Sequence, residues 1–154
     1  MMQYINATIN DLAQVHNIVQ ETIKTIYPRY YPQEVVDFFC QLHNTDNIQK
    51  DIANQTVGIL VDQGVIVGTG CHQDNHITRV YVLPQYQRKG YGNYIMECLE
   101  HKIAQTFDTV CLDASLPACT LYEKRGYITK KHCKLTVEND AVLVYEVMEK
   151  KLTI

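Results

Sequence analysis

The chain has 154 residues, of which 46% are hydrophobic and 20% charged, and its formal net charge is −3. These values predict one globular domain with a sizeable core. They argue against a general nucleic-acid binder, which is normally basic. No apolar run approaches the roughly 20 residues of a membrane span, and the amino terminus, MMQYINATIND, lacks the order of a signal peptide. We therefore expect a cytoplasmic protein with neither a nucleic-acid nor a membrane partner.

The cysteines form no C-x-x-C pair and no zinc-finger spacing with a histidine. Most of them stand inside apolar segments, which favours reduced, buried thiols over a metal site. The six are Cys40, Cys71, Cys98, Cys111, Cys119 and Cys133.

The first half of the chain predicts a strand, then helices, then antiparallel strands. TIND (8–11) resembles a capping box in front of a helix, and Pro28 ends that helix. YPRYYP (27–32) is expected to be a loop with three tyrosines. The predicted elements are a strand at 3–8, a helix from Leu12 to about Tyr27, a helix from Pro32 to Leu42, a short helix around Ile48 and Ile52, and strands at 56–61, 65–71 and 76–83.

The second half predicts a different order of elements. These are a helix from Gly90 to Phe107, a strand at 109–114, a short helix from Pro117 to Arg125 with Gly126 as its C-cap, and a hairpin of 127–137 and 141–149. The strand–helix–strand unit over 76–114 implies a parallel pair with a right-handed crossover. The sequence therefore predicts an α/β fold with a mixed sheet and helices on its faces.

The segment QYQRKGYGNY (85–94) joins a strand to a helix and contains two of the chain's seven glycines. A helix amino terminus presents unpaired N–H groups and a partial positive charge, which suits phosphate groups. Gly90 and Gly92 would let a phosphate approach the backbone, and Arg88 and Lys89 add positive charge. We therefore predict an anion site, with a simple tight turn as the alternative.

Two common phosphate loops do not fit this segment. The Walker pattern ends in Gly-Lys-Ser/Thr, whereas the chain has Gly-Tyr-Gly-Asn. The Rossmann fingerprint needs a third glycine, which GYGNYI lacks. A nucleotide-binding domain of either kind is therefore disfavoured.

QRKGYG (87–92) resembles instead the Q/R-x-x-G-x-G/A signature of the GNAT superfamily of N-acetyltransferases. The preceding VYVLPQYQ (80–87) resembles the strand and turn that lead into that signature. LDASLPACTLYEKRGY (112–127) is similar to the family's second block. The resemblance runs from about Ile77 to Tyr127.

The resemblance implies a single GNAT-like domain over 1–154, with six to seven strands and about four helices. Its central parallel strands, at 76–83 and 109–114, would splay apart to admit the pantetheine arm of acetyl-CoA. Helices within about 9–53 would face the acceptor, and about 76–127 would form the acetyl-CoA-binding core. Acetyl-CoA is then a co-substrate, and no metal is implied.

The resemblance also assigns residues to the cofactor. The signature amides from Arg88 to Gly92 would hold the pyrophosphate. The cofactor-binding residues of the signature are Gln87, Arg88, Lys89, Gly90, Tyr91 and Gly92. The backbone of Val80, Tyr81 and Val82 would pair with the pantetheine, and the Val82 N–H could polarise the thioester carbonyl. Ser115 stands where the family often has an asparagine that touches the pantetheine.

Tyr122 falls where the family commonly has a tyrosine general acid, which would protonate the leaving CoA thiolate and contact the cofactor. The alternative is that Tyr122 only packs in the core.

A primary amine of the lysine type has a pKa of about 10.4, so it is mostly protonated at neutral pH and must lose a proton before it attacks. The strand HITRVYVL (76–83) carries no acidic residue, although many relatives have a glutamate there. His76 is the candidate base, and His72 and Asp74 lie near it in sequence. The alternative is that all three are ordinary surface or turn residues.

In this family the segment between the first two helices lines the acceptor site. Tyr27, Tyr30 and Tyr31 could form an aromatic wall there for an ammonium group. The alternative is that two of them pack under the loop.

The leading hypothesis is therefore an acetyl-CoA-dependent N-acetyltransferase that works by direct transfer in a ternary complex. A covalent intermediate on Cys119 is the less favoured route. A non-catalytic acyl-CoA sensor is the alternative function. The acceptor is a small-molecule or peptide amine whose identity the signature does not specify, and a homodimer through the last hairpin is possible.

Overall fold

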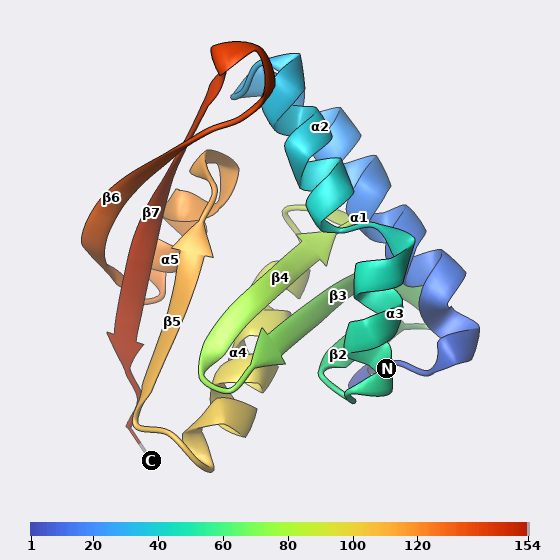
Figure 1. Cartoon of the computed structure of the whole chain (residues 1–154). Coiled ribbons are helices and arrows are strands. Elements are labelled where there is room, and N and C mark those ends of the chain that lie inside the picture. The colour runs from blue at the N-terminus through green and yellow to red at the C-terminus, as the bar shows by residue number, and fades with distance from the viewer. Residues whose placement is uncertain (154) are drawn as a thin grey trace.

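The computed structural model describes residues 1–153, which form one mixed sheet with helices on both faces (Figure 1). The strands are β1 (Met2–Asn6), β2 (Val57–Asp62), β3 (Val65–Gln73), β4 (His76–Val82), β5 (Thr109–Ala114), β6 (Ile128–Thr136) and β7 (Val142–Lys151). The α-helices are α1 (Leu12–Ile26), α2 (Gln33–Leu42), α3 (Thr45–Ala53), α4 (Tyr91–Ala104) and α5 (Cys119–Lys124). These elements match the expected six to seven strands and about four helices, and α5 corresponds to the short helix predicted from Pro117 to Arg125.

The sheet has the order β1-β2-β3-β4-β5-β7-β6, and β4 and β5 are its parallel pair. That pair is joined only where His76 faces Cys111 and Ile77 faces Leu112. Beyond Ile77 the two strands diverge toward their carboxyl ends (Figure 1). The predicted mixed sheet with a splayed central pair is therefore confirmed.

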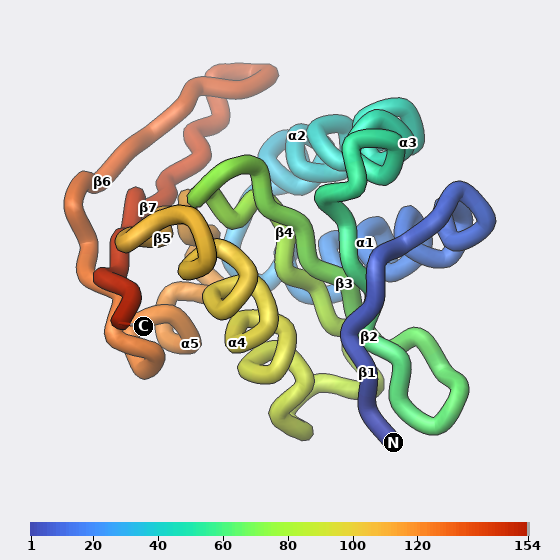
Figure 2. The backbone as a smooth tube through the Cα atoms, turned by 90° about the horizontal axis from the view of Figure 1, so that it is seen from below, coloured from blue at the N-terminus to red at the C-terminus, as the bar shows by residue number. Residues whose placement is uncertain are grey.

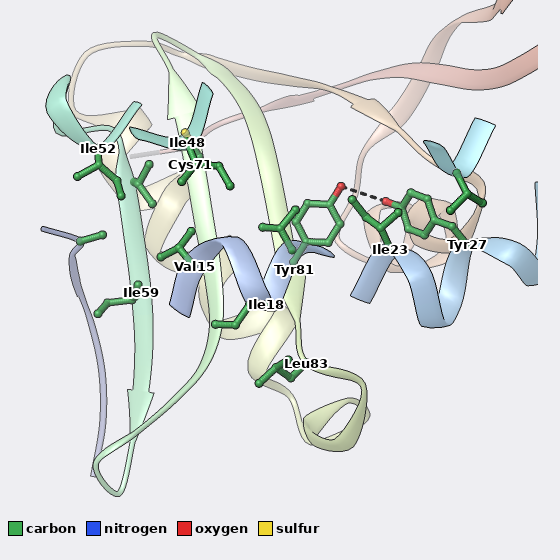
Figure 3. Close-up of a cluster of buried hydrophobic side chains, with 14 of the residues drawn as sticks. Val15, Ile18, Ile23, Tyr27, Ile48, Ile52, Ile59, Cys71, Tyr81 and Leu83 are labelled. Carbon is green, nitrogen blue, oxygen red and sulfur yellow. Dashed lines mark hydrogen bonds between the residues drawn. The ribbon is translucent and has the colours of Figure 1, made fainter. Parts of the chain in front are cut away.

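The helices cover the two faces of the sheet unequally. α1, α2 and α3 lie on one face, and α4 lies on the other, with α5 beside it (Figure 2). The buried residues form two clusters accordingly, one under α1–α3 and one under α4. In the first cluster Val15, Ile18 and Ile23 of α1 pack against the sheet, and the Tyr27 hydroxyl contacts that of Tyr81 (Figure 3).

The predicted boundaries hold to within a few residues. Before α1, the Thr8 N–H donates to the Asp11 carboxylate at 2.8 Å, as a capping box requires. The tyrosine-rich loop contains one turn of 3₁₀-helix, Tyr27–Arg29. Gly126 follows α5 with a φ of +94°, a left-handed conformation that suits glycine at a helix end.

No helix within residues 1–153 has the length and apolar character needed to cross a membrane. The cysteines among these residues are all free thiols.

Candidate active site

A cleft of about 650 Å³ opens where β4 and β5 diverge. One wall is β4 itself, and the start of α4 lies at one end. The segment from Ser115 to Tyr122 and parts of α1, α2 and α3 complete it. The splay of the parallel pair therefore creates the cavity, and the two halves of the chain line it together.

The end of the cleft at α4 has free backbone donors. No side chain caps this 14-residue helix, so its first N–H groups and its partial positive charge face the cleft. Gly90 is the N-cap with a φ of +87°, and Arg88 before it also has a positive φ, of +64°. A left-handed backbone is costly for a non-glycine residue such as Arg88, so its presence indicates that this local shape is needed.

The two glycines of this turn have different reasons to be glycine. Gly90 has open space around it, so its left-handed backbone is the constraint. A Cβ on Gly92 would meet only Leu121 at 3.7 Å and Val82 at 4.0 Å, which are ordinary contacts. The fold therefore does not exclude a side chain at Gly92, and the bare backbone there fits the close approach of an anion.

The polar side chains of the signature take separate positions. Arg88 lines the cleft, whereas the Lys89 ammonium lies 5.8 Å from the centre of the Tyr86 ring and outside the lining residues. Gln87 lines the cleft but donates its side-chain amide to the Val82 carbonyl at 3.0 Å. Tyr91 also lines the cleft, and its hydroxyl donates to the Asp62 carboxylate.

Toward its carboxyl end, β4 has backbone N–H and C=O groups on the side of β5 that no strand pairs with. The N–H of Leu83 donates to Val67 of β3, and successive residues of a strand point to opposite neighbours. The N–H groups of Val82 and Val80 therefore face the gap. Val80, Tyr81 and Val82 all line the cleft, so β4 presents a free edge to whatever enters.

Tyr122 stands opposite this edge, buried in α5 but lining the cleft. Burial, with smaller contributions from Tyr27 and Cys119, raises the pKa of its phenol well above the ordinary value. The hydroxyl is therefore protonated at neutral pH. Ser115 also lines the cleft, and its hydroxyl accepts a hydrogen bond from Tyr27 at 3.3 Å.

Cys119 lies one turn before Tyr122 but is not among the lining residues. Its thiol donates to the Ser115 carbonyl at 3.4 Å. Burial, together with Glu146 and Glu123, raises its pKa to about 11, so little nucleophilic thiolate exists at neutral pH.

The candidate base, His76, lies at the closed end of the gap, where β4 and β5 still pair. Its Nε2 is 3.8 Å from the Asp113 carboxylate, and both residues line the cleft. His72 lies outside the lining residues with its Nδ1 3.0 Å from the Asp74 carbonyl. Among the three candidates, the structure therefore brings only His76 into the cleft.

The three tyrosines of residues 27–31 separate in the structure. Tyr27 is buried and lines the cleft next to Phe39, with ring centres 4.8 Å apart. Tyr31 is also buried, but its hydroxyl accepts from the Leu116 N–H at 2.7 Å and so ties the loop to the segment after β5. Tyr30 is 51% exposed and lies outside the lining residues.

The sequence reasoning missed one group of cleft residues entirely. His43, at the end of α2, Asp51 of α3 and Arg79 of β4 meet in the cleft wall. The available signal was Arg79, a charged residue in the alternating apolar strand HITRVYVL. A buried charge at that position requires partners, which only the tertiary structure reveals.

Comparisons with known proteins agree with this geometry. The chain resembles a GCN5-related N-acetyltransferase from Rhodopseudomonas palustris at 24% identity, with a TM-score of 0.89 over 97% of this chain and 95% of that one. It resembles the PaiA N-acetyltransferase from Thermoplasma acidophilum, solved with coenzyme A, at 16% identity and a TM-score of 0.76 (98% and 99% covered). The ribosomal-protein-S18-alanine N-acetyltransferase from Escherichia coli is 17% identical with a TM-score of 0.75 (100% and 96% covered).

These structural similarities show the fold, and a comparison with sequence families shows the family. No curated protein sequence matches the chain. The family model described as an acetyltransferase (GNAT) domain, however, matches residues 26–151, which is most of the chain. The protein therefore belongs to the GNAT acetyltransferase family.

Proposed function

We propose that this protein is an acetyl-CoA-dependent N-acetyltransferase that transfers the acetyl group directly to a primary amine. The observation that carries the proposal is the convergence of three features in one cleft. These are the uncapped start of α4, the free edge of β4 and the protonated hydroxyl of Tyr122. The coenzyme A bound to the PaiA relative supports the choice of cofactor.

The residues present fit the pyrophosphate and the pantetheine arm of acetyl-CoA. The first backbone amides of α4 and the Arg88 side chain would hold the pyrophosphate. The free edge from Val80 to Val82 would hydrogen-bond the pantetheine as an additional strand does. The Ser115 hydroxyl would supply a further contact on the opposite side. When bound, acetyl-CoA supplies an activated acyl carbon and a thiolate leaving group.

Two groups of the chain would act at the reacting atoms. The Val82 N–H would donate to the acyl oxygen as negative charge develops on it. The Tyr122 hydroxyl would give its proton to the sulfur as the carbon–sulfur bond breaks and the amine nitrogen bonds to the acyl carbon. Burial keeps the phenol protonated before the transfer, and the same burial would destabilise an unprotonated thiolate beside it, which favours movement of the proton to the sulfur.

His76 is the proposed base, because it is the candidate that lines the cleft. The amine must lose a proton to form the neutral amide. His76 and Val82 lie at opposite ends of β4, about 20 Å apart at the usual strand rise, so the proton would reach the imidazole through a chain of water molecules. Asp113, 3.8 Å away, would stabilise the imidazolium that results. A His76→Gln variant tests this role, since it should lower kcat while leaving the Kd for CoA unchanged. A wild-type kcat in His76→Gln would remove His76 from the mechanism.

The first test is CoA release from acetyl-CoA across a panel of amines. The release is measured by chromatography, because the protein's own free cysteine thiols would react with a thiol dye. Release with one class of amine would support the enzyme and identify its acceptor class. If CoA binds but no amine yields release, the acyl-CoA sensor replaces the enzyme as the working hypothesis.

A further inference from the structure

Arg79 is a buried cation whose hydrogen bonds are incomplete. Its side chain is 5% exposed and lies in the wall of the cleft. The Nε donates to the Nδ1 of His43 at 2.9 Å, and the Nη2 contacts the Asp51 carboxylate at 2.6 Å. The third nitrogen, Nη1, is buried and has no hydrogen-bond partner. A buried, unpaired N–H costs about 1–3 kcal/mol, so its retention requires an explanation.

His43 adds a second donor at the same place. Because its Nδ1 accepts from Arg79, the neutral ring carries its proton on Nε2. Burial and the adjacent guanidinium lower the pKa of His43 to about 3, which keeps the ring neutral. His43 also lines the cleft, so the cluster of Arg79, His43 and Asp51 offers donors to a ligand.

The charge of this cluster favours a small, singly charged anion. Asp51 balances the charge of Arg79 in the free protein. Lys50, exposed and also in the cleft lining, adds one positive charge that no ion pair within residues 1–153 neutralises. A carboxylate matches a guanidinium in geometry and would bring the local charge close to zero.

The cluster adjoins the reaction centre, not the cofactor's phosphate end. Arg79 and Tyr81 are two residues apart on β4, so their side chains share one face of the sheet. The ring of His43 packs edge-on against that of Tyr81, with centres 5.7 Å apart. Tyr81 in turn contacts the Tyr27 hydroxyl at 3.3 Å, and Tyr27 contacts Ser115. The cluster thus lies on the side where helices α1–α3 close the cleft.

We propose that the acceptor is a small amino acid, with a carboxylate that binds Arg79 while its amine is acetylated. This proposal rests on the proposed function and specifies its substrate class. Tyr27, Phe39 and Leu42 of the cleft wall would contact the carbon chain between the two charged groups. The substrate carboxylate would complete the hydrogen bonds of Arg79 once the guanidinium, whose Nη1 is buried in the free protein, turns toward the cleft.

The decisive test uses the unmodified protein and does not require turnover. Protein saturated with CoA, which has no acetyl group to transfer, is titrated calorimetrically with glycine, β-alanine, 4-aminobutyrate or leucine, each paired with its carboxamide. We expect at least one acid to bind about 10- to 100-fold more tightly than its amide, as the loss of a charged hydrogen bond predicts. Equal affinity within every pair would overturn the proposal.

Arg79→Gln supplies the residue-specific test, and Arg29→Gln is the matched control. Arg29 is exposed and outside the cleft lining, yet its loss changes net charge equally. Arg79→Gln should abolish the preference for acid over amide, and Arg29→Gln should keep it. A preference that survives in Arg79→Gln would contradict the assignment. If Arg79→Gln fails to bind CoA, the proposal is decided by the wild-type affinities for each acid and its carboxamide.

CoA release measured with the same compounds separates this proposal from the proposed function. Release from acids and amides at equal kcat/KM would leave the acetyltransferase standing and overturn the carboxylate site. No release from any amine would overturn the acetyltransferase, while the titration would still test the carboxylate site.

Discussion

Two arginine–carboxylate clusters lie on opposite faces of the sheet, and they differ in one respect. The carboxylate of Glu100 in α4 accepts from Arg125 at 2.8 and 3.1 Å, from Tyr127 at 2.9 Å and from Lys150 at 3.1 Å. The remaining Arg125 nitrogen donates to Asn93. Every nitrogen of this guanidinium therefore has a partner. In the second cluster Arg79 has partners on Nε and Nη2 only.

The difference separates a structural cluster from one that is open to a ligand. The Glu100 cluster joins α4 to the segment after α5 and to β7, and it is complete without any other molecule. The Arg79 cluster joins α2, α3 and β4 and has an unfilled donor in the wall of the cleft. The complete Glu100 cluster therefore fits a role in maintaining the fold, whereas the incomplete Arg79 cluster is the one that we propose for substrate binding.

The largest effect on stability is expected from a substitution that breaks the complete Glu100 cluster. Glu100→Ala would leave Arg125 and Lys150 partly buried without their carboxylate, and the free energy of unfolding should fall by about 3–5 kcal/mol. Urea unfolding measures it. Glu97→Ala, on an exposed position of the same helix, is the control and should change stability by less than about 0.5 kcal/mol. Equal effects of the two substitutions would show that the cluster is not structural.

A smaller effect is expected in the Arg79 cluster, where the free energy of unfolding should depend on pH through His43. The pKa of His43 falls from 6.5 to about 3 on folding because of burial and Arg79. Between these values the unfolded chain binds a proton that the folded protein does not, so stability falls as pH drops. From pH 6.5 to 5 the loss should be about 1.6 kcal/mol, because the unfolded histidine is already half protonated at pH 6.5.

His43→Gln should remove most of that slope, and comparing the two proteins cancels the titration of the carboxylates they share. Urea unfolding at several pH values measures the difference. If wild type and His43→Gln lose stability in parallel, the neutral, buried state of His43 is refuted.

The smallest effects are expected at the two glycines before α4, where the fold requires Gly90 and we propose that cofactor binding requires Gly92. Gly92→Ala should leave unfolding free energy within about 0.5 kcal/mol, because the fold has room for the Cβ. It should weaken CoA binding about tenfold by obstructing the approach of phosphate. Gly90→Ala is the counterpart and should destabilise the protein by about 1–2 kcal/mol, since its φ is +87°. Calorimetry and urea unfolding report the two quantities, and unchanged CoA affinity in Gly92→Ala would exclude the proposed anion site.

The sequence predicted what depends on local pattern. Helical spacing, hairpin turns and the glycine pair locate α1, the antiparallel strands and the start of α4 to within a few residues. The signature at 87–92 and the block at 112–127 identified the family, and Tyr122 and His76 do face the cleft.

What the sequence did not predict depends on residues that are distant along the chain. His43, Asp51 and Arg79 come from three elements, and no spacing rule connects them. The separation of Tyr27, Tyr30 and Tyr31 into cleft, surface and loop contacts also depends on how the chain turns after α1. Both were beyond reach because tertiary packing, not local propensity, decides them.

The most direct test of the account is the Tyr122→Phe variant, compared with Tyr94→Phe, which removes a hydroxyl from α4 outside the cleft lining. With an amine that supports release, the account predicts that Tyr122→Phe lowers kcat about 100-fold or more while the Kd for CoA stays within about twofold. Tyr94→Phe should keep both values. A Tyr122→Phe enzyme that turns over at the wild-type rate would contradict the proposed mechanism.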